Sequence, residues 1–106
     1  MTQSYIYIIG PENGPFKVGY SVTPDDRCRQ LQTGQPMKLR VHHRRTIETK
    51  NARAMEQLIH RQLNHFRIKG EWFNIPLGDL IQEIDFAFIR WSDTPNLSEL
   101  LKMRLI

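Results

Sequence analysis

The sequence has little cysteine and no long apolar run, and each absence excludes a class of protein. A single cysteine, Cys28, can form no disulfide within the chain and supplies too few thiolates for a cysteine-based zinc site. No stretch approaches the ~18 apolar residues that a membrane span needs. The first residues lack the basic and apolar segments of a secretory signal. We therefore expect a soluble protein of the cytoplasm with no membrane partner.

Basic residues are present but unevenly distributed. Of the 15 Lys and Arg residues, eleven lie in residues 27–69, where only two acids occur, a net charge of +9. The segments on either side, 1–26 and 70–106, are net acidic. Such asymmetry favours a polyanion as partner more than the overall charge of +4 does.

The pattern of apolar residues predicts one α+β domain spanning residues 1–106, with a small three-stranded β-sheet flanked by helices. β-Branched and aromatic runs predict strands, and apolar residues at helical spacing predict helices. The expected order is ββαβαα followed by a C-terminal helix. Its elements are strands at 5–9, 16–20 and 36–47, helices at 23–32, 49–69 and 76–88, a short extended piece at 71–75, and the C-terminal helix at 94–106.

The third strand has two kinds of side chain in alternation. Positions 39, 41 and 47 are apolar, while positions 38, 40, 42 and 44 are basic. Because alternate residues of a strand face opposite sides, this pattern predicts a half-exposed strand with a basic outer face.

Glu56 interrupts an apolar helical stripe. It lies four residues after Ala52 and three before Ile59, so all three share nearly one face of the helix at 49–69. A carboxylate on such a face is costly unless it is paired or bound to a cation. One interpretation is a metal ligand; the other is an edge residue that pairs with Arg53, His60 or Arg27.

Further polar side chains occupy the first two strands and the first helix. Tyr5 and Tyr7 share one face of the first strand, Lys17 lies in the second strand, and Arg27 lies early in the helix. Taken singly, each has a simple structural interpretation: packing for the tyrosines and a solvated charge for Arg27.

Taken in order, these residues resemble the GIY-YIG nuclease superfamily. Tyr5-Ile6-Tyr7 stands in place of GIY, and Lys17-Val18-Gly19 stands in place of YIG ten residues later. Arg27 matches the family's helical arginine and Glu56 its metal-binding glutamate. The runs Lys17–Ser21, Leu31–Gly34, Ala54–Glu56 and Gly70–Phe73 are similar to the short phage and bacterial branch, and the resemblance covers residues 4–88.

The resemblance implies a metal-dependent endonuclease that hydrolyses phosphodiester bonds of DNA, with RNA as the alternative substrate. Tyr7 would be the general base or its hydrogen-bond relay. Glu56 would hold one divalent cation, Mg²⁺ or alternatively Mn²⁺. Arg27 would grip the scissile phosphate. Gly19 would allow a close backbone approach.

Lys17 departs from the family pattern because it stands where the second motif has a tyrosine. It could lower the pKa of Tyr7 or steady the nucleophile, in which case it belongs to the catalytic set. It could equally mark a catalytically silent nucleic-acid-binding module that keeps the fold. A third alternative is a protein-interaction subunit or homodimer that uses the leucine-rich helix at 94–106.

Supporting roles are expected at further positions. Tyr5 occupies the first motif, Asn74 resembles a polar residue near the metal, and His43 would either contact phosphate or serve as a satisfied sheet histidine. The residues expected to position the nucleic-acid backbone are Arg29, Lys38, Arg40, Arg44 and Arg45.

The charge of residues 27–69 generates a prediction about salt. If Lys and Arg contacts to phosphate carry the affinity, the binding constant for DNA should fall steeply between 50 and 200 mM salt, because counterions are released on binding. Fluorescence anisotropy with a labelled duplex measures this dependence. A binding constant that barely changes over this range would contradict it.

Overall fold

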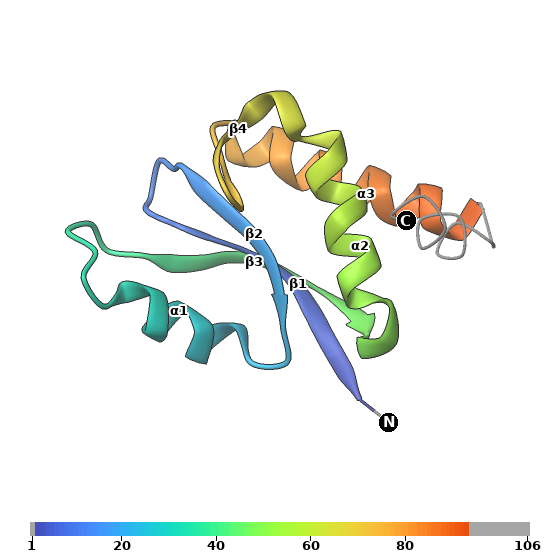
Figure 1. Cartoon of the computed structure of the whole chain (residues 1–106), viewed down its shortest axis with the longest axis horizontal. Helices are drawn as coiled ribbons and strands as arrows, with labels where there is room; N and C mark the ends of the chain where they lie inside the picture. Colours follow the sequence, from blue (N-terminus) through green and yellow to red (C-terminus); the bar gives the residue numbers. More distant parts are fainter. Residues whose placement is uncertain (1, 94–106) are drawn as a thin grey trace.

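The computed structural model describes residues 2–93, which form an α+β fold with one antiparallel sheet between helices (Figure 1). The elements are β1 (Gln3–Gly10), β2 (Phe16–Ser21), α1 (Pro24–Gln32), β3 (Arg40–Glu48), α2 (Thr49–Gln62), the 3-10 turn η1 (Asn64–Phe66), β4 (Arg67–Lys69), β5 (Trp72–Phe73) and α3 (Leu77–Asp93). The strand order is β3-β1-β2-β5-β4. The predicted fold class is therefore confirmed.

The hairpin of β1 and β2 lies at the centre of the sheet. In its register Tyr7 faces Gly19 and Ile8 faces Val18. Because side chains alternate along a strand, Ile6 and Ile8 point to one face and Tyr7 to the other. The two faces consequently carry different cores.

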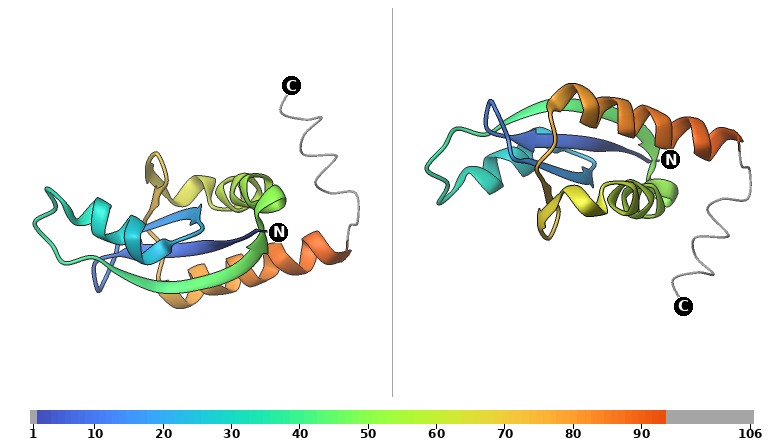
Figure 2. Two further views of the ribbon diagram at one scale, coloured as in Figure 1. Left: turned by 90° about the horizontal axis from the view of Figure 1, so that it is seen from below. Right: turned by 90° about the horizontal axis from the view of Figure 1, so that it is seen from above.

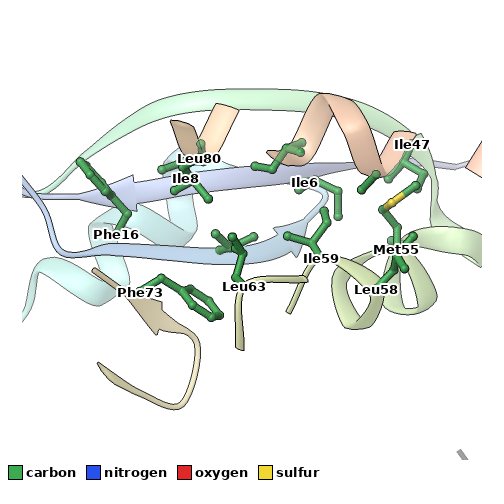
Figure 3. Close-up of a cluster of buried hydrophobic side chains, with 14 of the residues drawn as sticks. Ile6, Ile8, Phe16, Ile47, Met55, Leu58, Ile59, Leu63, Phe73 and Leu80 are labelled. Atoms are coloured by element: carbon green, nitrogen blue, oxygen red, sulfur yellow. The ribbon is translucent and has the colours of Figure 1, made fainter. Parts of the chain in front are cut away.

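The larger core lies between the sheet and the helices α2 and α3. Ile6, Ile8 and Val18 contribute from the strands, and Met55, Leu58, Ile59, Leu80 and Ile84 from the helices (Figure 3). A smaller cluster on the opposite face joins Tyr7, Ile9 and Leu39 to α1. Figure 1 shows α1 on the other side of the strands from α2, and two turned views show α3 running along β3 (Figure 2).

Two predictions about residues 49–75 are wrong: the sheet has five strands instead of three, and the helix expected to reach residue 69 ends at Gln62. The backbone leaves helical geometry at Leu63, with φ −96° and ψ 7°. Gly70 adopts φ 58°, which lets β4 and β5 fold back on each other as a short hairpin. Burial of Phe73 attaches this hairpin to the larger core.

The predicted alternation in the third strand is also wrong, because β3 contains a bulge. Ile8 pairs with His43, whereas Ile9 pairs with Val41, so His42 is the extra residue. A bulge shifts the side-chain parity by one. Leu39 and Val41 accordingly join the Tyr7 cluster, while Ile47 joins the core beneath α2 and α3.

The beginning of α1 follows prediction in part. Pro24 begins the helix and Asp25 and Asp26 lie in its first turn, but the Thr23 side chain makes no capping hydrogen bond. Among the described residues, no helix is long and apolar enough to cross a membrane. The helix expected at 94–106, with its suggested dimer or partner surface, lies outside the described residues.

Candidate active site

The Tyr7 side chain lies across β2 in the space that Gly19 leaves free. It is almost fully buried, and its cross-strand neighbour is Gly19. A Cβ at Gly19 would lie 2.5 Å from the Tyr7 Oη and 2.7 Å from the ring carbon that bears it. Any other residue at position 19 would therefore displace the phenol, so the glycine allows Tyr7 to extend past its own strand toward the outer edge of β2.

That edge is only partly covered. β5 pairs with Phe16 and Lys17 alone, so within the described part of the chain no strand pairs with the outer side of β2 beyond them. Val18 is the first residue of β2 beyond those that pair with β5. Its N–H donates to the Glu71 backbone carbonyl at 3.1 Å, and its carbonyl lies 2.8 Å from the His60 Nε2. The short β5 thus leaves the outer side of β2 without a paired strand at Gly19, where the phenol lies.

Lys17 forms the strongest charge contact of this region. Its Nζ donates to the Glu71 Oε1 at 2.6 Å, with the lysine side chain only 9% exposed. A buried ammonium needs such a partner, because an uncompensated charge is costly away from water. Lys17 therefore fixes the Glu71 carboxylate at the β4–β5 turn, beside the end of β2.

Helix α2 brings Glu56 and His60 to the same edge. They lie one turn apart, and both are half-buried. Burial, together with the nearby Glu71 carboxylate, raises the pKa of Glu56 to about 7, against the smaller opposing effect of Lys17 and Arg53. Glu56 forms no side-chain hydrogen bond or ion pair within residues 2–93.

Arg27 reaches this group from α1. Burial raises the pKa of Tyr7, the Arg27 guanidinium opposes this shift, and the charges of Glu71 and Glu56 add smaller increases. Tyr7 is consequently a protonated phenol at neutral pH. The pKa of Tyr7 thus responds to Arg27, Glu71 and Glu56, while the side-chain hydrogen bond that Arg27 makes in the described structure runs to the Gln30 Oε1 at 3.4 Å.

The donors present fit a hard divalent cation held mainly through Glu56. Its carboxylate has no partner among the described residues, and its raised pKa shows that the ionised form lacks compensation there. Across residues 2–93, no group of three or more His, Cys, Asp or Glu side chains could enclose a metal ion. Mg²⁺ suits so open a site, since it commonly keeps several waters and takes one or two carboxylates.

Three supporting residues do not join this group. Tyr5 shares the face of Tyr7 but lies near Arg44, whose guanidinium carbon is 6.0 Å from its ring centroid. His43 pairs with Ile8 and so points to the opposite face. Asn74 follows Phe73, which pairs with Phe16, so the register places it away from Gly19.

The basic residues expected to contact the nucleic-acid backbone do not form one surface. Arg44 bonds to Asp25 of α1 at 2.8 Å, whereas Arg45 bonds to Asp85 of α3 on the other face of the sheet at 2.5 Å. Arg40 pairs with Glu12, and Arg29 pairs with Asp26. Only Lys38 of the five has no ion pair within the described segment.

Two members of the group, Glu71 and His60, were not predicted as site residues. For Glu71, the sequence feature that could have predicted a site residue is its position between Gly70 and the aromatic pair at 72–73. This position places Glu71 in a turn beside a buried strand. His60 follows Glu56 by one helical turn.

A family comparison adds to this geometry. The model of the T5orf172 domain matches residues 4–91. The chain belongs to the T5orf172 domain family. No curated protein and no solved structure matches the chain. The matched span contains every residue of the group at the β2 edge.

The contact between Gly19 and Tyr7 predicts a coupled pair of substitutions. Gly19→Ala should lower the free energy of unfolding by about 1–3 kcal/mol, because the new methyl overlaps the phenol. The cost should shrink in a Tyr7→Ala background, where that overlap is gone. Urea unfolding of the four proteins measures the coupling. Equal costs in both backgrounds would show that the phenol does not occupy the space above Gly19.

The raised pKa of Glu56 predicts a pH-dependent stability. Its folded-state pKa of about 7 lies above its ordinary value of 4.5, so the contribution to stability is full below pH 4.5 and is lost as the pH rises through 7. Glu56→Gln should therefore stabilise the metal-free protein increasingly from pH 5 to pH 8. We expect on the order of 1 kcal/mol, discounted because water screens a half-exposed group, or about 5 °C in Tm.

Thermal unfolding in EDTA at the two pH values tests this expectation. Glu48→Gln, an exposed change at the start of the same helix, is the control and should show no such growth. If Glu56 instead pairs with Arg53, Arg27 or His60, the amide would destabilise the protein at pH 8, contrary to this expectation.

Proposed function

We propose that this protein is a metal-dependent endonuclease of the GIY-YIG type that hydrolyses phosphodiester bonds of DNA, with Mg²⁺ as its cofactor. The observation that carries the proposal is that the Arg27 and Glu56 side chains both act electrostatically on the Tyr7 phenol, which lies across β2 at Gly19. These residues come from a strand and two helices, and simple packing gives no reason to bring a phenol, a guanidinium and an unpaired carboxylate together. Membership in the T5orf172 domain family supports a nucleic-acid-related role.

Each side chain has a chemical role in this proposal. Arg27 binds the scissile phosphate and offsets the negative charge that develops during hydrolysis. Tyr7, a protonated phenol with a raised pKa, orients the attacking water and relays its proton to a neighbouring acceptor. The Glu71 carboxylate, held by Lys17, would serve as that acceptor. A cation bound at Glu56 would supply Lewis-acid polarisation of the phosphate.

Lys17 has a different role from the tyrosine that it replaces in the motif. Its ammonium is neutralised by Glu71 at 2.6 Å, so it does not act as a free charge on the nucleophile. It fixes the second carboxylate of the site. The same ion pair favours the alternative function, a catalytically silent DNA-binding module. Lys17 stands where the second motif has a tyrosine, and its pairing with Glu71 gives it a structural role at that position.

The test is a plasmid-nicking assay with Mg²⁺, Mn²⁺ or EDTA. Wild-type protein should nick with either metal and not in EDTA. Glu56→Gln should lower the rate by roughly 100-fold or more while the protein stays folded and binds DNA, because the amide keeps the size but removes the charge that a hard cation needs. Glu48→Gln makes the same chemical change outside the site and should nick at the wild-type rate.

Two results would contradict the proposal. A Glu56→Gln protein that nicks at the wild-type rate would remove Glu56 from the reaction. A wild-type protein that binds DNA but nicks with neither metal would favour the silent binding module.

A further inference from the structure

Five basic side chains of α2 and β4 have no acidic partner in the described structure. They are Lys50, Arg53, Arg61, Arg67 and Lys69, and none belongs to an ion pair within residues 2–93. By contrast, most basic residues around β3 and α1 already pair with carboxylates. These are Arg29, Arg40, Arg44 and Arg45. A phosphate approaching those arginines would have to displace an acid that would then repel it.

Part of this basic set lines a hollow on the outer side of α2. Residues 53, 57 and 61 recur at a spacing of four, so they form one stripe along the helix. The hollow measures about 380 Å³ and is lined by Gln57, His60, Arg61, Asn64 and Arg67. Its lining contains three nitrogen-rich basic side chains and two amides, but no carboxylate.

Arg67 is fixed in place at the wall of the hollow. Its guanidinium donates to the Asn64 Oδ1 at 3.3 Å and to the Gly70 carbonyl, and it lies 5.0 Å from the centroid of the Phe73 ring. Arg61, in contrast, is exposed and has no side-chain hydrogen bond in the described structure. One cation is therefore preorganised and the other is free to meet a ligand.

The hollow adjoins the candidate active site through His60. This histidine lines the hollow, while its Nε2 lies 2.8 Å from the Val18 carbonyl at the edge of β2. Along α2, Arg61 is five residues beyond Glu56, which is about 7.5 Å of helix rise. The hollow and Glu56 therefore lie within two turns of the same helix.

We propose that this hollow binds a backbone phosphate of duplex DNA beside the proposed active site, with Arg61 as the contacting cation. The inference rests on the proposed function and deepens it by naming the surface that carries the DNA. Charge complementarity selects the ligand, because the hollow is lined by two arginines and amide N–H groups and by no carboxylate. In this proposal the DNA strand contacts α2 and β4, and it does not contact the arginines of β3.

The experiment measures binding of a labelled duplex in EDTA, so that no strand is cut, between 50 and 200 mM salt. Arg61→Gln should raise Kd by roughly tenfold, as expected for one charge-assisted contact, and should reduce the slope of log K against log salt by about 0.9. Arg90→Gln removes the same charge from an exposed site on α3 and is the matched control, for which the slope should stay at the wild-type value.

The possible failures separate the inference from the function on which it rests. If Arg61→Gln keeps the wild-type slope while wild-type protein binds and nicks DNA, the inference is overturned and the endonuclease stands. Equal losses for Arg61→Gln and Arg90→Gln would also overturn it, because they would reflect net charge alone. Wild-type protein that does not bind DNA would overturn the proposed function itself.

Discussion

The position of the Tyr7 phenol depends on the absence of a side chain at Gly19. With the ring lying across β2, its hydroxyl reaches an edge that β5 covers at only two residues. Had β5 been longer, backbone hydrogen bonds would occupy this edge and no polar group could gather there. The arrangement of the other side chains follows from this open edge, since Glu56 and His60 reach it from the helix on one face of the sheet and Arg27 from the helix on the other.

Burial and charge act against each other at this edge. Burial and the Glu71 carboxylate raise the cost of ionising Glu56, and of the two carboxylates only Glu71 has a cation in direct contact, from Lys17. Glu56 remains the less compensated of the two. An arrangement of this kind is a common property of functional sites, because a cation or substrate can supply the missing compensation when it binds.

Several features could be predicted from the sequence because each depends on local patterns. The buried first hairpin, the helix that begins at Pro24, the α+β class and the apolar face of α2 all follow from residue type and spacing. The bulge at His42 could not, because it is set by pairing with β1 and the side-chain pattern alone does not indicate it. The role of Glu71 was hidden for a similar reason: its partner Lys17 lies 54 residues earlier, and neither residue is unusual in its own segment. Likewise, the ion pairs of the β3 arginines with α1 and α3 appear only once the layers are assembled.

The separation of Lys17 from Glu71 along the chain also bears on the order of folding. The β1–β2 hairpin and α1 are built from neighbouring segments and can form early, whereas the Lys17–Glu71 contact closes a loop of more than half the described chain. The group at the β2 edge is therefore complete only when the last hairpin has docked. A partly synthesised or partly unfolded chain would present the basic helix without the assembled edge, so under the proposed function it would hold a polyanion before it possessed the groups proposed to act on one.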